Sequence, residues 1–454
     1  MFRHHVAFRM GSNDKFRPAL EDDHAILSRI DVLDDLGLHR FGIDCLMAGG
    51  HAKSLQPSEI AFDLLLLATA VMGTDTRIAR ATNSQDGWTR EIHLYVPVSQ
   101  PELWRSQASL LARMLNFLSG DRWTFSFRAR PRAHRTIVPI PKEFNLRDRS
   151  CVCLLSGGLD SFIGAIDLLA SGEKPIFVSH YWDGATSVYQ QHVLDALAAK
   201  FDESNFDSIR AHLGFPRDSI KEGGEENTQR SRSFLFFAMA AYVASGLGKE
   251  TEIKVPENGL ISLNVPLDPL RLGSLSTRTA HPFYLARWNE LLSNLGIAAA
   301  LHNPYATKTK GQMVAECAKP KFLKKYAPQT MSCSSPTKGR WTGHGPRHCG
   351  HCLPCLIRRA SLLHGLGAGV DTTEYGVELN GAVLDSKKAE GEHVRAFKLA
   401  CSRLKARPNL ARIAVCKTGP LIDVMDRFDD YVAVYQDGMA EVGKLLKTSD
   451  SRPQ

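Results

Sequence analysis

The chain has 454 residues, of which 43% are hydrophobic and 23% are charged, and its formal net charge is +8. These values are typical of a soluble globular protein with two or three domains, and a charge this mild suits a nucleotide or an acidic partner without arguing for nucleic acid. The most apolar stretch, residues 60–72, contains Asp63 and is too short to span a membrane, and no secretory signal is visible. We therefore expect a cytoplasmic protein whose ten cysteines are reduced, so that a cysteine cluster indicates a metal site or catalysis rather than disulfides.

Residues 1–148 predict a small N-terminal α+β domain. Ser58 is typical of a helix N-cap and precedes apolar residues at helical spacing, while Gly120 ends a second apolar helix that begins near Pro101. Alternating apolar and polar residues predict strands at residues 77–81, 90–96 and 123–127. The arginine-rich stretch 128–132 could contact nucleic acid or a partner, although a solvent-exposed strand end fits it better. Nothing in this domain looks catalytic.

The region from residue 149 to 326 opens with a strand, a glycine turn and a helix. The apolar run 151–155 has no helical period and predicts a buried parallel strand, and helical spacing returns from Ser161 onward. Between them lies Ser-Gly-Gly-Leu-Asp-Ser, residues 156–161. Two adjacent glycines leave bare backbone N–H groups at a helix N-terminus, which is a natural place for phosphate. The serines can add hydroxyl donors, and Asp160 can hold a Mg²⁺ ion that bridges phosphate oxygens.

Strands and helices then alternate through this region. We expect further strands at residues 176–179, 209–212, 252–255 and 297–301, and helices at residues 190–197, 234–247 and 282–295. Alternation of this kind predicts an α/β fold with a doubly wound parallel sheet and a ligand at the carboxyl ends of the strands. The glycine turn lies at such an end.

Residues 327–364 contain a group of metal-binding character. Cys333, Cys349, Cys352 and Cys355 give the spacing C-x15-C-x2-C-x2-C, which suits a closed tetrahedral Zn²⁺ site with a structural role. Three cysteines at the short spacing also resemble iron–sulfur ligation, so an iron–sulfur cluster is the competing interpretation.

Residues 365–454 predict a helical C-terminal extension. Its clearest helices lie at residues 392–404 and 431–446, and residues 448–454 are expected to be disordered. A helical cap on the preceding domain or on a partner is the simplest interpretation.

The glycine motif resembles the PP-loop of the ATP pyrophosphatase superfamily, and it lacks the lysine of a Walker loop. These enzymes cleave ATP between the α- and β-phosphates, adenylate a substrate oxygen and release pyrophosphate. The resemblance implies an adenylating ligase with the HUP-type fold of adenine nucleotide alpha hydrolase-like proteins. It also implies an ATP site formed by Ser156, Gly157, Gly158, Leu159, Asp160 and Ser161.

Residues 150–360 further resemble the QueC family of 7-cyano-7-deazaguanine synthases. The shared motifs, in order, are the PP-loop, Gln-Gln-His at 190–192, Arg-Ser-Phe at 232–234, Thr-Lys at 309–310, and the cysteine array with the two arginines that follow it. The likeness implies Asp160 and Ser161 as catalytic residues, with Arg232 and Lys310 balancing phosphate charge. QueC proteins lack a comparable N-terminal domain and helical tail, and their substrate segment rich in aspartate and tyrosine is not recognisable near Pro256.

This longer chain resembles the QueC-like QatC proteins of the Qat anti-phage defence systems, which carry such extensions. The resemblance implies ATP-dependent adenylation of a deazapurine carboxylate, 7-carboxy-7-deazaguanine, and its transfer to a partner protein from the same defence operon. Three alternatives stay open: a synthase of queuosine biosynthesis, a PP-loop enzyme that thiolates tRNA, and a non-catalytic nucleotide-binding scaffold. The intact residues 156–161 argue against the last.

Overall fold

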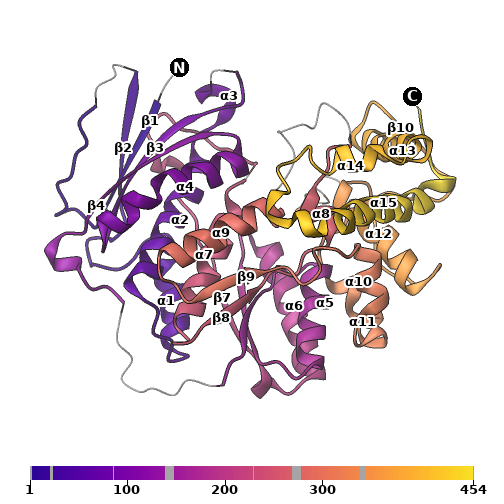
Figure 1. Ribbon diagram of the computed structural model, residues 1–454, viewed down its shortest axis with the longest axis horizontal. Helices are drawn as coiled ribbons and strands as arrows, with labels where there is room; N and C mark the ends of the chain where they lie inside the picture. Colours follow the sequence, from indigo (N-terminus) through magenta and orange to yellow (C-terminus); the bar gives the residue numbers. More distant parts are fainter. Residues whose placement is uncertain are drawn as a thin grey trace.

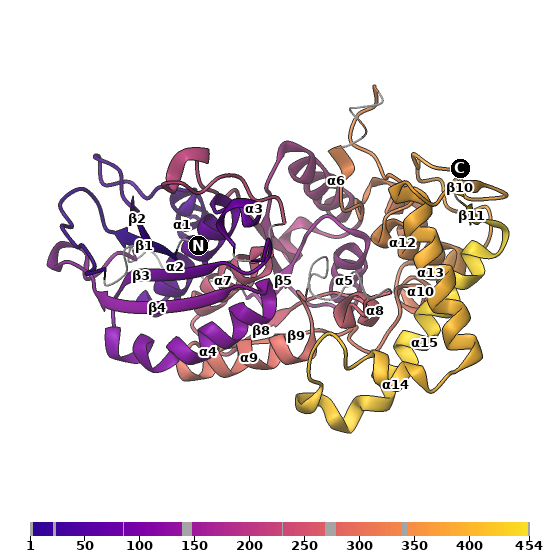
Figure 2. The same ribbon diagram turned by 90° about the horizontal axis from the view of Figure 1, so that it is seen from above.

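The computed structural model describes residues 3–20, 24–84, 86–138, 148–228, 230–267, 278–337, 339 and 343–452. Three parts follow one another along the long axis of the molecule: an N-terminal four-stranded sheet, a central five-stranded sheet and a C-terminal group of helices (Figure 1 and Figure 2). Within the described residues, no helix has both the length and the apolar character that crossing a membrane requires.

The N-terminal part is a parallel sheet flanked by helices. Its elements are β1 (Arg3–Arg9), β2 (Ala25–Asp31), α1 (Ile43–His51), α2 (Glu59–Arg77), α3 (Arg80–Asn83), β3 (Glu91–Val98), α4 (Pro101–Ser119) and β4 (Arg122–Ala129). The strand order is β2-β1-β3-β4, and every neighbouring pair is parallel. The arrangement is therefore α/β, which corrects the α+β domain expected from the sequence. The helices capped by Ser58 and ended by Gly120 are confirmed as α2 and α4.

One strand prediction in this part is wrong, and two strands were not predicted. The strand expected at residues 77–81 is instead the end of α2 followed by the short helix α3, because two arginines there bond to distant groups rather than to a neighbouring strand. Arg77 donates to the carbonyl of Phe215 at 3.1 Å, and Arg80 pairs with Asp121 at 2.6 Å. The strands β1 and β2 were not predicted. Buried positions in both are occupied by polar side chains, such as His4 in β1, so the sequence lacks a clear alternation of apolar and polar residues.

The central part confirms the predicted parallel sheet. Its elements are β5 (Cys151–Leu154), α5 (Leu159–Ala170), β6 (Pro175–His180), α6 (Gly184–Lys200), β7 (Asp207–Ala211), α7 (Arg232–Ser245), β8 (Thr251–Lys254), α8 (Gly259–Leu263), α9 (Pro282–Asn294) and β9 (Ala299–His302). The order is β7-β6-β5-β8-β9 with every pair parallel. Along β5, Val152 and Leu154 pack into the core that contains α7, whereas Cys153 packs into a second core with α5 and α6. Helices therefore cover both faces of this sheet.

The C-terminal part is mostly helical. Its elements are α10 (Lys310–Glu316), α11 (Pro320–Tyr326), α12 (Leu353–Leu366), β10 (Val383–Asp385), α13 (Ala389–Ala406), α14 (Leu410–Ala414), α15 (Phe428–Leu445) and β11 (Asp450–Arg452). The expected disorder of residues 448–454 is wrong for residues 450–452, because β11 pairs in parallel with β10. Residues 453–454 lie outside the described part of the chain.

A buried ion-pair network joins the N-terminal part to the central part. Helix α4 of the N-terminal part also lies beside helix α9 of the central part (Figure 1 and Figure 2). Asp75, near the end of α2, lies between Arg80 and Arg90. Its Oδ2 accepts hydrogen bonds from the backbone N–H (2.9 Å) and the hydroxyl (2.8 Å) of Ser231, the N-cap of α7. Burial acts to raise the pKa of Asp75, but the two arginine charges outweigh it and lower that pKa.

We expect Asp75→Asn to destabilise the whole molecule, since it leaves two buried arginines undercompensated and weakens the start of α7. The free energy of unfolding should fall by about 3–5 kcal/mol, measured by urea denaturation at pH 7. The matched control is Glu225→Gln, which removes an exposed ion pair with Arg217 and should change stability by less than about 1 kcal/mol. Equal effects of the two variants would contradict the role of Asp75.

Candidate functional site

The turn between β5 and α5 adopts a conformation that favours glycine. Gly157 has a φ of +82°, and a Cβ at this position would lie 3.0 Å from the backbone nitrogen of Gln190. Gly158 is the N-cap of α5 and, as a glycine, has no side chain that could cap the helix. The first N–H groups of α5 lie at this turn, where the helix dipole is positive.

Two serine hydroxyls flank this turn. The Oγ of exposed Ser156 lies 3.1 Å from the Oγ of buried Ser161 and accepts a hydrogen bond from the N–H of Gly158 at 3.3 Å. Ser161 lies 3.0 Å from the carbonyl of Gly158, to which its hydroxyl donates. The turn thus gathers N–H and O–H groups at one point, which is the donor set of an anion site.

Asp160 connects the turn to the end of a second strand. Its Oδ2 accepts hydrogen bonds from the side chain (2.7 Å) and the backbone N–H (3.3 Å) of Asn258, which follows β8. Its Oδ1 lies 3.1 Å from the Nζ of Lys310, the first residue of α10. The strands β6 and β7 lie on one side of β5, and β8 and β9 lie on the other. Asp160 therefore lies where the strand order reverses, the usual position of ligands in such sheets.

Glu257, the residue before Asn258, completes this group. Burial, followed by the charge of Asp160 and a hydrogen bond to it, raises the pKa of Glu257 well above its usual range. Burial also acts to raise the pKa of Asp160, but the charge of Lys310 and the hydrogen bonds from Glu257 and Asn258 outweigh it and lower that pKa. The two carboxyl groups are therefore shifted in opposite directions, which favours an ionised Asp160 beside a protonated Glu257.

Lys310 is positioned by the start of α10 and by the C-terminal helix α15. Thr309 and Gln312 form a capping box, with hydrogen bonds of 3.0 Å and 2.8 Å between each side chain and the other residue's backbone N–H. The buried carboxyl group of Glu441, on α15, accepts hydrogen bonds from the Thr309 hydroxyl and the Gly311 N–H. A Cβ at Gly311 would collide with Glu441, so the glycine permits this close approach.

Arg232 lies apart from the Asp160 group, at the carboxyl end of the neighbouring strand β6. Its Nη2 lies 3.4 Å from the carbonyl of His180, the last residue of β6. Burial lowers the pKa of Arg232, and the charge of Asp183 acts in the opposite direction. Among the described residues no carboxylate lies within ion-pair distance of Arg232, so its charge is available to an anion at this edge of the sheet.

Three residues of the site were not predicted from the sequence: Glu257, Asn258 and Glu441. The first two follow directly on β8, as the glycine turn follows β5, and a carboxyl–amide pair at the end of a neighbouring strand is a signal that the sequence does contain. Glu441 lies in an ordinary amphipathic helix, and no local pattern distinguishes it.

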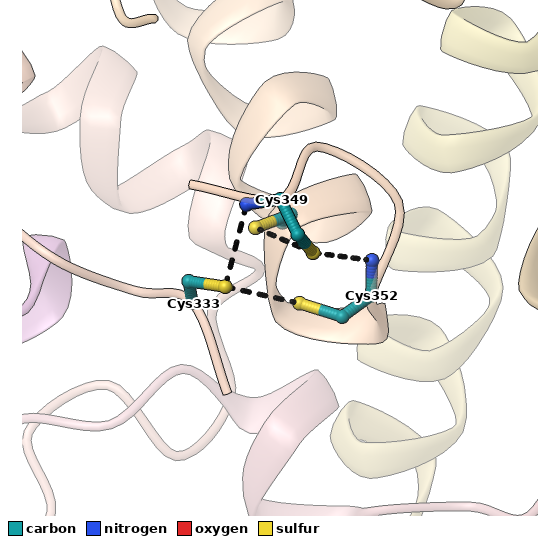
Figure 3. A group of neighbouring side chains, drawn as sticks. Cys333, Cys349 and Cys352 are labelled. Atoms are coloured by element: carbon teal, nitrogen blue, oxygen red, sulfur yellow. Dashed lines mark hydrogen bonds between the residues drawn. The ribbon is translucent and has the colours of Figure 1, made fainter. Parts of the chain in front are cut away.

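The four predicted cysteines come together around the N-terminus of α12 (Figure 3). Their Sγ atoms all lie within 4.8 Å of one another, and the pairs Cys333–Cys352 and Cys349–Cys355 are each 3.9 Å apart. All four are free cysteines. The backbone N–H groups of Ser335 and Cys349 each lie 3.4 Å from the Cys333 Sγ, to which they donate.

This arrangement could bind one tetrahedral zinc ion. Zn–S bonds of about 2.3 Å place the sulfurs of a tetrahedral site about 3.8 Å apart, close to the 3.9 Å of two pairs here. The space between the sulfurs suits a single ion, which favours zinc over an iron–sulfur cluster. Four thiolates leave no coordination position open, so such an ion would have a structural role.

The sequence matches no protein-family model and no curated protein. A function can therefore be proposed only from the sequence motifs and from the geometry of the glycine turn and the cysteine cluster.

We expect the purified protein to contain one tightly held Zn²⁺ ion per chain. Cys355→Ser removes a ligand, and because metal binding and local folding are coupled, it should lower the metal content and reduce Tm by about 5 °C or more. Elemental analysis and differential scanning fluorimetry measure both. Cys416→Ser, at an exposed cysteine outside the cluster, should leave both unchanged. Iron with visible absorbance, or fresh protein without metal, would contradict this expectation.

The protonation of Glu257 should appear in the pH dependence of stability. Because its folded-state pKa is raised, the wild type loses stability as pH rises from the ordinary glutamate pKa towards the folded value. Glu257→Gln has no such titration and imitates the protonated carboxyl. The difference in unfolding free energy between variant and wild type should therefore shift in favour of the variant between pH 5 and pH 8, measured by urea denaturation without Mg²⁺. The exposed Glu250→Gln should give a flat difference; a flat difference for Glu257→Gln would refute the assignment.

Proposed function

We propose that this protein is an ATP-dependent adenylating enzyme of the PP-loop ATP pyrophosphatase type, with the HUP-type fold of that superfamily. The observation that carries the proposal is the position of Asp160, which lies in the first turn of α5 beside the glycine turn and faces Lys310 and Glu257. An anion site and an oxygen-rich group that can hold a cation thus lie side by side. That pairing is what a Mg²⁺-bound polyphosphate needs.

The residues around Asp160 fit Mg²⁺. The carboxyl groups of Asp160, in the first turn of α5, and of Glu257, after β8, are hard oxygen ligands that contact each other. When bound, Mg²⁺ supplies charge neutralisation as pyrophosphate leaves. Lys310, the first residue of α10, and Arg232, the first residue of α7, would balance the remaining phosphate charge.

The proposed chemistry is activation of a carboxylate. An oxygen of the substrate carboxylate attacks the α-phosphorus of ATP, the α–β phosphoanhydride bond breaks, and pyrophosphate leaves with the bonding electron pair. An amine then attacks the acyl carbon, loses a proton and displaces AMP. In this scheme the N–H of Gly158 and the hydroxyls of Ser156 and Ser161 bind the departing pyrophosphate, and Asp160 with Lys310 fixes the orientation of the phosphates.

The resemblance to the QueC family supports 7-carboxy-7-deazaguanine as the carboxylate. The resemblance to QatC proteins supports anti-phage defence as the setting and a protein amine from the same operon as the acceptor. The N-terminal sheet and the C-terminal helices add surface on both sides of the central sheet (Figure 1), which favours a macromolecular acceptor over ammonia.

Product analysis with ATP labelled at the α-phosphate tests the reaction type. We expect AMP and pyrophosphate, and we expect Asp160→Asn and Lys310→Met to lower the rate by about a hundredfold or more. The control is Asp35→Asn, at an exposed aspartate, which should keep the full rate. Release of ADP and phosphate would overturn the proposal.

A second assay identifies the acceptor. The enzyme is incubated with ATP, Mg²⁺, 7-carboxy-7-deazaguanine and the proteins encoded beside it, and each protein is weighed intact. A mass gain of one deazaguanine acyl group, lost with Asp160→Asn, supports protein modification. In parallel incubations with ammonia, or with tRNA and a sulfur donor, a free nitrile would assign the queuosine-type synthase reaction and thiolated tRNA would assign the RNA-modifying alternative.

A further inference from the structure

The segment that leads into the cysteine cluster lies directly on the glycine turn. The backbone N–H of Met331 donates to the carbonyl of Gly157 at 2.9 Å, and the N–H of Leu159 lies 3.5 Å from the Oγ of Ser332. A Cβ at Gly158 would lie 3.3 Å from the Met331 carbonyl. Cys333 directly follows Ser332 in the sequence. The first cysteine of the cluster is therefore one peptide unit away from Ser332, whose Oγ lies at the start of α5.

The hydrogen bonds of Ser332 leave its proton free for a ligand. Its backbone N–H donates to the Nε2 of His348 at 3.2 Å, which fixes the backbone of Ser332. Its Oγ accepts from the Leu159 N–H and, at 3.4 Å, from the Nη1 of Arg358. A hydroxyl accepts two hydrogen bonds and donates one. Both acceptor positions are thus used. Among the described residues the O–H has no hydrogen-bond acceptor, and it lies at the N-terminus of α5.

Arg358 is a buried cation surrounded by neutral groups. Its side chain is fully buried, and it donates to the Ala327 carbonyl (2.6 Å) and to the hydroxyls of Thr330 (2.7 Å), Thr373 (3.2 Å) and Ser332. Among the described residues no carboxylate lies within ion-pair distance of it. A buried charge of this kind is costly unless an opposite charge is near. The cysteine cluster lies on the same segment, and its thiolates together with an anion bound at the glycine turn would supply negative charge near Arg358.

We propose that Ser332 is a phosphate-binding residue of the nucleotide site and that the cysteine cluster, together with Arg358, positions it. The inference rests on the proposed function, because the phosphate is that of the bound ATP. Ser332 would donate its O–H to a phosphate oxygen while Arg358 and the Leu159 N–H hold the Oγ. A metal ion that ties Cys333 to the start of α12 would fix the segment on the turn, so metal occupancy and nucleotide affinity would be linked.

Binding measurements on hydroxyl variants test the role of Ser332. Isothermal titration calorimetry with ATP and Mg²⁺, and separately with inorganic pyrophosphate, gives Kd for wild type, Ser332→Ala, Ser332→Thr and Ser334→Ala. Ser334 is the matched control, because it lies in the same segment with an exposed side chain. We expect Ser332→Ala to weaken both ligands by about tenfold or more, as a hydrogen bond to a charged group is worth at least 1.5 kcal/mol. The threonine, which keeps the hydroxyl, should restore most of the affinity.

Each outcome separates this inference from the proposed function. Wild type that binds ATP together with Ser332→Ala of equal affinity would overturn the role of Ser332 and leave the ATP site intact. Wild type that binds neither ATP nor pyrophosphate would overturn the proposed function itself. Loss of affinity in Ser334→Ala as well would indicate general disturbance of the segment and contradict the inference.

The link to the metal has its own readout. Hydrogen exchange at residues 156–161 is compared between zinc-loaded protein and protein treated with a chelator, each with and without ATP. We expect faster exchange of this turn and a Kd raised about tenfold when zinc is removed, with far-ultraviolet circular dichroism unchanged. Arg358→Lys should retain part of the affinity that Arg358→Met loses, since the lysine keeps the charge. Zinc removal that leaves both exchange and Kd unchanged would overturn the link.

Discussion

A buried carboxylate, that of Asp160, ties together three segments that are far apart in the sequence. It is 7% exposed and is compensated by Asn258 after β8 and by Lys310 at the start of α10. A carboxylate removed from water is costly unless charges and hydrogen bonds replace the lost hydration. The glycine turn, the end of β8 and the start of α10 must therefore assemble together. The contacts that form the candidate site are therefore also contacts that the folded state needs.

In each outer part of the chain, a carboxyl group accepts hydrogen bonds at the N-terminus of a helix that begins with a candidate site cation. In the N-terminal part, Asp75 accepts hydrogen bonds from Ser231 at the start of α7, and the first residue of α7 is Arg232. In the C-terminal part, Glu441 accepts hydrogen bonds at the start of α10, whose first residue is Lys310. A carboxyl group at a helix N-terminus is favoured by the helix dipole. Each extension thus positions one candidate cation of the site, which gives it a role that does not depend on a partner.

The central part was predictable because its signals are local. A short apolar strand, two glycines and an apolar helix occur within residues 151–169, and the four cysteines identify their own cluster. The residues that were missed act through distant contacts: Arg80 was expected in a strand and lies in α3 because Asp121 binds it, and Glu441 matters only because α15 packs against Gly311. The periodicity of apolar residues indicates which side of a segment faces the core and which faces solvent. It does not indicate which distant charged residue the segment pairs with.

The distribution of buried charge separates arginines that support the fold from those available to a ligand. Arg90 and Arg130 are each paired with buried aspartates, so their charges are satisfied within the protein. Among the described residues Arg232 and Arg358 make hydrogen bonds only to carbonyls and hydroxyls, although the charge of Asp183 also acts on Arg232. Asp160 is paired with Lys310 and is therefore not the partner of either arginine. Under the proposal, an oxyanion at the turn and the thiolates of the cluster would bring negative charge to these arginines, and Ser332 would connect the two sites.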